Sequence, residues 1–145
     1  MVFRLLVAGG RNFYDYRLLD SALTEWLHKY TSEQRKLVSS DVLDEVTKKG
    51  VNITIVNGDA SGADRLSTMW ARYNDLKVEC FPADWKKYGA SAGPLRNSKM
   101  IDSGIDYAIL FEGGRGTKNM KSLLRESHIS FQEVIDRPSI QVVYS

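Results

Sequence analysis

Residues 113–117, Gly-Gly-Arg-Gly-Thr, have the composition of an anion-binding turn. The segment before them, residues 106–111, is mostly apolar and typical of a short buried strand, while Met120, Leu123 and Leu124 recur at helical spacing. Glycines on a strand-to-helix turn let the backbone turn tightly and approach a ligand closely. The free N–H groups and positive dipole end of the following helix suit phosphate. The stretch therefore predicts a phosphate-binding turn, and the plainer alternative is a threonine-capped turn without a ligand.

Three more polar loops accompany other apolar segments. Residues 9–11 (Gly-Gly-Arg) follow the apolar run 2–8, and residues 58–64 (Gly-Asp-Ala-Ser-Gly-Ala-Asp) follow the β-branched run 51–56. Residues 93–97 open the helix before the segment 106–111. In a parallel sheet such loops share one edge, so together they predict a binding site for an anionic ligand.

Charged side chains in these loops have chemistry that fits such a ligand. Arg11, Arg96 and Arg115 can bind phosphate or carboxylate oxygens in a bidentate fork, and we expect Arg11 and Arg96 to be solvated without ligand. Asp59 and Asp64 can accept hydrogen bonds from ribose hydroxyls or an amino group, although Asp64 alternatively only caps its helix. The predicted ligand-binding residues are Gly9, Gly10, Arg11, Gly58, Asp59, Ser61, Gly62, Asp64, Trp85, Arg96, Asn97, Gly113, Gly114, Arg115, Gly116 and Thr117.

The pattern of strands and helices around these loops predicts an α/β fold. Strands are expected at residues 2–8, 51–56, 78–81, 106–111 and 130–135, with a sixth candidate at 140–144. Helices alternate with them: one capped by Asp15, a second beginning at Thr31 in a capping box with Gln34 and ending at Gly50, and others after each later strand. This alternation predicts a Rossmann-like three-layer architecture, a parallel sheet with helices on both faces, in a single domain over residues 1–145.

Composition excludes several classes of protein. The formal charge of +2 and the absence of a basic stripe with interleaved aromatics disfavour a nucleic-acid partner. The single cysteine, Cys80, lies in an apolar run, so we expect it to be buried rather than reactive. No apolar run approaches the length of a membrane span, and we expect a cytoplasmic protein without metal or cofactor.

Five motifs in order resemble the SLOG superfamily, and in particular its small single-domain bacterial and phage members. They are Gly-Gly-Arg-x-Phe, Gly-Asp-Ala-x-Gly-Ala-Asp, Pro-Ala-x-Trp, Ala-Gly-x-x-Arg-Asn-x-x-Met and Phe-x-Gly-Gly-x-Gly-Thr, within about residues 3–125. The resemblance implies a Rossmann-like fold and a nucleotide-derived ligand. The superfamily includes the LOG phosphoribohydrolases, which cut the N-glycosidic bond of nucleoside monophosphates, and sensor domains that bind nucleotides without cutting them.

One departure from the LOG pattern bears on function. Met120 stands where the LOG enzymes carry a catalytic Glu, although Arg96 matches the LOG arginine. This favours a module that binds a nucleotide-derived molecule as a sensor, carrier or sequestering protein. The alternative is a nucleotide N-glycosidase or phosphoribohydrolase that uses another carboxylate, with Asp59 and Arg96 as catalytic candidates. Because LOG-type relatives form dimers, the resemblance also implies a homodimer, for which Trp26, Trp70 and Tyr73 offer apolar surface.

Overall fold

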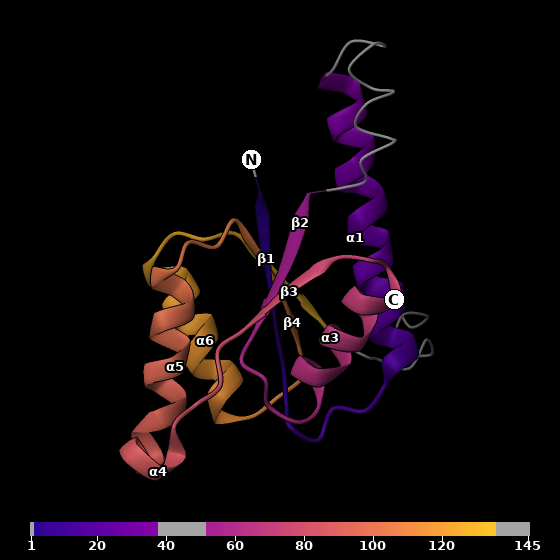
Figure 1. Ribbon diagram of the computed structural model, residues 1–145. Coiled ribbons are helices and arrows are strands. Elements are labelled where there is room, and N and C mark those ends of the chain that lie inside the picture. The colour runs from indigo at the N-terminus through magenta and orange to yellow at the C-terminus, as the bar shows by residue number, and fades with distance from the viewer. Residues whose placement is uncertain (1, 38–51, 136–145) are drawn as a thin grey trace, which may run out of the picture.

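Five parallel strands form the centre of the protein. The computed structural model describes residues 2–37 and 52–135 (Figure 1). The strands are β1 (Phe3–Ala8), β2 (Ile53–Asn57), β3 (Lys77–Cys80), β4 (Tyr107–Phe111) and β5 (Phe131–Val134), in the order β3-β2-β1-β4-β5. Each neighbouring pair is parallel, which confirms the predicted α/β fold.

Helices cover both faces of this sheet. α1 (Tyr16–Leu37) and α3 (Ala63–Tyr73) lie on one side, and α5 (Ala92–Asp102) and α6 (Arg115–Glu126) lie on the other (Figure 1). The short helix α4 (Trp85–Tyr88) and a 3₁₀ turn, η1 (Gly89–Ser91), lead into α5. None of these helices, which lie within the described part of the chain, is both long enough and apolar enough to cross a membrane.

Alternating side chains of the strands supply the two layers of core. Leu5 and Val7 of β1 pack into one buried cluster together with Trp70, whereas Leu6 and Ala8 pack into a second with Met120. Successive side chains of a strand point to opposite faces, so a strand buried on both sides becomes a continuous apolar run. This explains why the central strands β1, β2 and β4 could be predicted from such runs.

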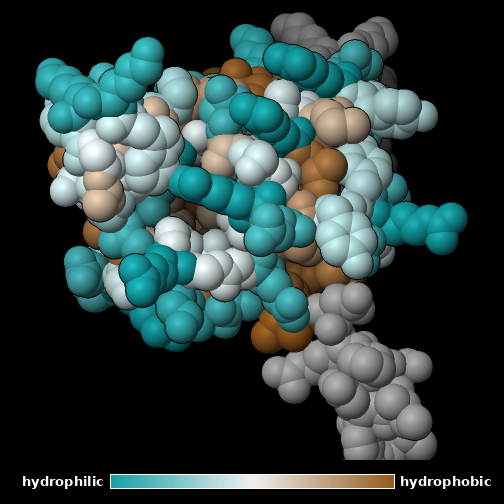
Figure 2. Space-filling model, turned by 90° about the horizontal axis from the view of Figure 1, so that it is seen from below, coloured by the Kyte–Doolittle hydropathy of each residue, from teal (hydrophilic) through white to brown (hydrophobic). Residues whose placement is uncertain are grey.

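The order of the strands places a crevice at one edge of the sheet. The chain proceeds from β1 outward through β2 and β3, and then returns to place β4 on the other side of β1. At such a reversal, the loops after the two adjacent strands diverge and leave a crevice at their carboxyl ends. Figure 2 views this end of the molecule and shows a hollow surrounded largely by hydrophilic side chains.

Two predictions about local structure are wrong. Thr31 does not begin a second helix, because α1 continues through it and its hydroxyl donates to the carbonyl oxygen of Leu27 at 2.9 Å. A threonine inside a helix can satisfy its hydroxyl in this way, so a capping-box pattern is not decisive. Cys80 is exposed rather than buried, because it ends the edge strand β3. The remainder of the predicted second helix and the candidate strand 140–144 lie outside the described residues.

Candidate functional site

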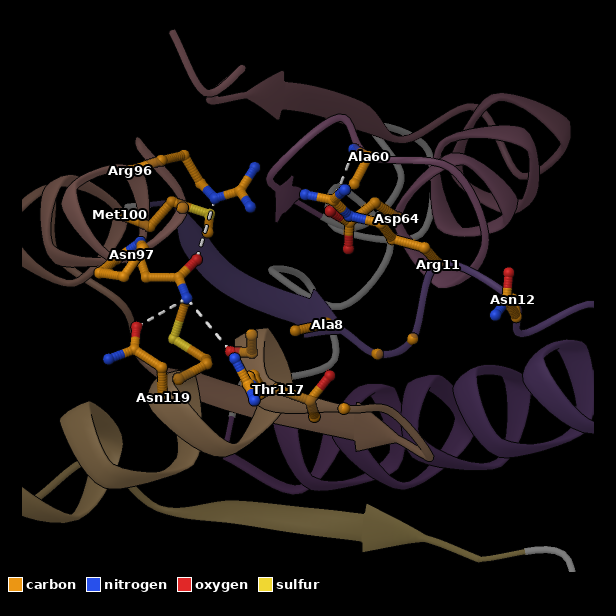
Figure 3. Close-up of a pocket in the computed structure, with 18 of the residues that line it drawn as sticks. Ala8, Arg11, Asn12, Ala60, Asp64, Arg96, Asn97, Met100, Thr117 and Asn119 are labelled. Carbon is orange, nitrogen blue, oxygen red and sulfur yellow. Dashed lines mark hydrogen bonds between the residues drawn. The ribbon is translucent and has the colours of Figure 1, made fainter. Parts of the chain in front are cut away.

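A pocket of about 570 Å³ lies at the carboxyl ends of β1 and β4. Figure 3 shows Arg11, Asp64, Arg96, Asn97 and Thr117 arranged around it, contributed by segments far apart in the sequence. The loops predicted to meet at one rim therefore do meet. The pocket is lined by Ala8, Gly9, Gly10, Arg11, Asn12, Ala60, Asp64, Trp85, Ala90, Gly93, Pro94, Arg96, Asn97, Met100, Gly114, Arg115, Gly116, Thr117, Asn119 and Met120.

The N-terminus of α6 forms one wall of the pocket. Gly114 is its N-cap residue, and no side chain caps it. The first N–H groups of a helix have no partner within the helix, and they carry the positive end of its dipole. A Cβ atom added at Gly114 or Gly116 would meet nothing within 4 Å. Packing within the protein therefore does not require glycine at either position, and both leave room at the pocket wall.

Other glycines in the motifs hold the loops together. A Cβ at Gly9 would lie 2.6 Å from the Cβ of Ala63, and one at Gly62 would collide with the carbonyl oxygen of Gly10. Gly62 also has φ = 83°, which favours glycine. The amide of Gly10 donates to the carbonyl oxygen of Glu112 at 2.8 Å, so the loop after β1 is tied to the loop after β4. These contacts explain how three separate loops keep one geometry.

Arg96 is a structural link as well as a cation of the site. Its Nη1 donates to the carbonyl oxygen of Gly58 at 2.6 Å, and its Nε donates to Oδ1 of Asn97 at 2.9 Å. Burial, foremost, lowers the pKa of the Arg96 guanidinium, although Asp64 nearby acts in the opposite direction. The expectation that Arg96 is solvated is therefore wrong, because its guanidinium is half-buried and connects α5 to the loop after β2.

Asn97 extends this link to α6. The side chain is buried, and its Nδ2 donates to the carbonyl oxygen of Gly116 at 3.2 Å and to Oδ1 of Asn119 at 2.9 Å. These bonds are drawn in Figure 3. Asn97 thus fixes the start of α6 against α5, so that a predicted ligand-binding residue also positions the glycine-rich turn before α6.

Asp64 brings a buried carboxyl group to the pocket. It is 7% exposed, and its Oδ2 accepts a hydrogen bond from the amide of Ala60 at 3.2 Å. Burial raises the pKa of this carboxyl to about 6, even though Arg96 and the Ala60 amide favour its charged form. The N-cap residue of α3 is Gly62, and the Asp64 carboxylate accepts from the Ala60 amide, which precedes the helix, so Asp64 does not act as the predicted alternative, a helix cap. A carboxyl group that titrates near neutral pH can act as an acid or a base.

Arg11 and Trp85 contact each other at the mouth of the pocket. The Cζ atom of Arg11 lies 4.7 Å from the centroid of the Trp85 ring, within the range of a cation–π interaction. Both side chains are exposed, so both are accessible to a molecule that enters the pocket.

Some predicted residues lie in adjoining hollows. Gly58, Asp59 and Ser61 line a hollow of about 380 Å³ that shares Arg11, Ala60, Trp85 and Arg96 with the main pocket. Gly113 lines a third hollow, of about 470 Å³, beside Gly10 and Gly114. Asp64 therefore faces the main pocket, whereas Asp59, the catalytic candidate, lines an adjoining hollow.

Several pocket residues were not predicted from the sequence. Asn119 lies one helical turn after Gly116, and Asn12 follows Arg11 directly. Both are polar residues beside predicted site residues, so their sequence positions could have identified them. Ala8, Met100 and Met120 form an apolar floor that also belongs to the core, with Met120 only 1% exposed. No sequence pattern distinguishes the apolar residues of the pocket floor from the other apolar residues of the core. Within residues 2–37 and 52–135, no cluster of three His, Cys, Asp or Glu residues is suitable for a metal ion.

Comparisons with known proteins agree with the loop motifs. Residues 3–88 match the YspA, cpYpsA-related SLOG family. The chain is also 31% identical over 113 residues to the Gene 61 protein of Mycobacterium phage D29, an alignment that covers 73% of this chain and 90% of that protein. No solved structure gives a significant match. The match to the family spans more than half of the chain and includes the loops after β1 and β2 at the pocket, so the chain belongs to the YspA, cpYpsA-related SLOG family.

Proposed function

We propose that the protein binds a nucleotide or a nucleotide-derived small molecule, with a phosphate group at the N-terminus of α6. The observation that carries this proposal is the pair Gly114 and Gly116. Neither needs to be glycine for packing, and both lie at a helix N-terminus without a side-chain cap. Glycine, which has no side chain, lets a phosphate oxygen approach the backbone N–H groups of a helix N-terminus closely.

Charge and size support the same ligand class. Arg11, Arg96 and Arg115 line the pocket together with the buried Asp64. Guanidinium groups bind phosphate oxygens in pairs, and a buried carboxyl group suits ribose hydroxyls as an acceptor. A volume of about 570 Å³ lies within the usual range for small-molecule sites, roughly 300–1,000 Å³. The proposal therefore covers a sensor, carrier or sequestering protein.

A thermal-shift screen tests this proposal. The compounds are nucleoside mono-, di- and triphosphates, nicotinamide dinucleotides, ADP-ribose and cyclic nucleotides, because a ligand that binds only the folded state raises its melting temperature. The variant Gly114→Asp places a negative charge at the proposed phosphate position, where its side chain has open space. We expect it to fold and to lose the ligand-induced shift.

Ser122→Asp is the matched control. It adds the same charge to an exposed position of the same helix, outside the pocket lining, and should keep the shift. If no compound stabilises the unmutated protein, or if folded Gly114→Asp responds as the unmutated protein does, the proposed phosphate position is wrong.

The Asp64 carboxyl favours a second candidate function, hydrolysis of a nucleotide N-glycosidic bond. Water would replace the base at the anomeric carbon, with release of free base and ribose phosphate. Met120, which occupies the position of the LOG glutamate, is a buried part of the pocket floor and cannot transfer a proton. Asp64 is the carboxyl that faces the pocket, and its pKa is raised to about 6 by burial.

Chromatography of long incubations with nucleoside monophosphates separates the two functions. Base release that Asp64→Asn abolishes and Asp59→Asn preserves would support the hydrolase. Absence of base release together with a thermal shift would support the binding protein.

We further propose that the chain forms a cytoplasmic homodimer of single-domain subunits. Trp70 cannot contribute to the interface, because it is fully buried in the core. Tyr73, at 87% exposure, and the neighbouring Met69, at 58%, leave apolar surface on α3. Light scattering at micromolar concentration tests the assembly, and a monomeric mass would contradict it.

A further inference from the structure

The guanidinium group of Arg11 has an unusual environment for a cation beside an anion site. It lies over the Trp85 ring, and within residues 2–37 and 52–135 its side chain has no hydrogen bond or ion pair. The nearby charge of Arg11 helps to lower the pKa of Arg96, so the two cations repel each other. The Trp85 ring is therefore the main favourable contact of this guanidinium within the part of the chain that the structure describes.

The structure holds the Trp85 ring in place independently of Arg11. Asp84 caps the short helix α4 by accepting from the amide of Lys87 at 3.1 Å. The ring edge rests on the start of α5, where a Cβ at Gly93 would lie 3.3 Å from the ring. The side chain remains 46% exposed, and it is the one aromatic ring in the described lining of the pocket.

We propose that Arg11 and Trp85 form an exchangeable stack. In the empty protein the guanidinium covers the ring. On binding, the flat base of a nucleotide takes its place on Trp85, and the released Arg11 binds the anionic group of the same ligand. The inference rests on the proposed function and adds which side chain receives the base. It also states the ligand class, since the molecule must carry both a flat aromatic ring and an anion.

Physical chemistry supports such an exchange. Guanidinium groups and nucleobases both stack on aromatic rings, so one planar group can replace the other. The exchange costs the cation–π contact, but it moves Arg11 to a phosphate group that also relieves its repulsion with Arg96. An uncharged nucleoside would have to displace Arg11 without offering it an anion. The stack therefore discriminates against ligands that carry only one of the two parts.

The variant Arg11→Ala tests the exchange, because the predicted effects on two probes have opposite signs. For adenosine, removing the guanidinium uncovers the ring, so affinity should rise about two- to fivefold. For AMP, the loss of a charge-assisted contact outweighs this gain, so affinity should fall at least about twofold. Binding is followed by quenching of tryptophan fluorescence and confirmed by calorimetry.

Variants of Trp85 test the stacking surface itself. Trp85→Ala should weaken AMP binding by about fivefold to a hundredfold, because stacking of one base contributes that much. It should not weaken the affinity for ribose 5-phosphate, which carries no base to stack and gains from an Arg11 that no longer has to leave the ring. Trp85→Phe should keep most of the AMP affinity. Tyr88→Ala is the matched control, since Tyr88 is exposed on the same helix but outside the pocket lining.

The outcomes of these experiments distinguish a failure of the exchangeable stack from a failure of the proposed function. If AMP binds but Trp85→Ala changes nothing, the base does not stack there, while nucleotide binding stands. Equal weakening of adenosine and AMP by Arg11→Ala would show that Arg11 holds the base rather than yielding to it, which overturns the exchange. Because stacking tolerates any base, a screen that finds another nucleotide while AMP fails to bind also overturns it. If no nucleotide binds the unmutated protein, the inference and the proposed function both fail.

Discussion

The buried carboxyl of Asp64 predicts that the empty protein loses stability as the pH rises. Burial raises its pKa from 3.8 to about 6 in the folded state. The folded protein therefore holds a proton that the unfolded chain has already released between these pH values. In that range the free energy of unfolding falls with increasing pH, and above the folded pKa the cost of ionising a buried group is present in full.

The size of the effect follows from the difference in pKa. Each pKa unit corresponds to about 1.4 kcal/mol, so ionised Asp64 destabilises the folded protein by about 3 kcal/mol, most of it appearing between roughly pH 4 and pH 7. Asn at this position can still accept the hydrogen bond from the Ala60 amide but carries no charge. We therefore expect Asp64→Asn to be more stable than the unmutated protein at pH 7.5, and to lose this advantage at pH 4.

Urea unfolding at both pH values measures the effect. A difference of about 3 kcal/mol corresponds to a shift of roughly 1–3 M in the urea midpoint. Other carboxyl groups contribute equally to both proteins, so the change in the difference between them isolates Asp64. Asp75→Asn is the matched control, because Asp75 is exposed and has φ = 55°, which Asn tolerates. If Asp64→Asn changes stability by the same amount at pH 4 and pH 7.5, Asp64 does not take up a proton on folding.

Three other substitutions have expected effects on urea unfolding of the empty protein. Arg96→Ala should lower the free energy of unfolding by about 1.5–3 kcal/mol, because the half-buried guanidinium bonds to the Gly58 carbonyl and to the Asn97 side chain; an unchanged midpoint would show that these bonds are replaced by water. Gly62→Ala should cost more than Gly89→Ala, since both have positive φ but only Gly62 also lies against another loop; equal costs would contradict this packing role. Asp15→Ala should cost about 1 kcal/mol through loss of the bond from the Leu18 amide, and a cost near zero would mean that α1 does not depend on its cap.

The central strands of the sheet could be predicted from the sequence because they are buried on both faces. Residues 53–57 are all buried and read as a continuous apolar and β-branched run. The cap of α1 by Asp15 was likewise predicted and is confirmed by the 3.1 Å bond from the amide of Leu18. Thr31 shows the limit of such local signals, because the same residue type caps a helix or lies inside one according to which carbonyl its hydroxyl reaches.

The sequence also predicted that the loops after the strands lie at one edge of the sheet. It did not predict which way each side chain in those loops points. Parallel topology alone brings the carboxyl ends of β1 and β4 together. Asp59 and Asp64 lie five residues apart in the sequence, and their residue type alone does not distinguish them. The turn at Asp59, with φ = 55°, and the first turn of α3 place them differently, so that Asp64 is buried at the main pocket and Asp59 is exposed in an adjoining hollow. Such directions depend on the dihedral angles of a few turn residues, which residue type does not determine.

The glycines of the motifs show how fold and site are combined in the same short stretches. Gly113 and Gly114 are adjacent, yet a Cβ at Gly113 would collide with Oγ1 of Thr117, whereas one at Gly114 would meet nothing. The first glycine lets Thr117 and the loop after β1 pack closely, and the second leaves the helix N-terminus accessible to a ligand. Substitution at Gly113 should therefore reduce stability, and substitution at Gly114 should reduce binding without reducing stability. Two adjacent glycines are therefore required for different physical reasons, one for packing and one for access to the helix N-terminus. Only the positions of the neighbouring atoms distinguish these two roles.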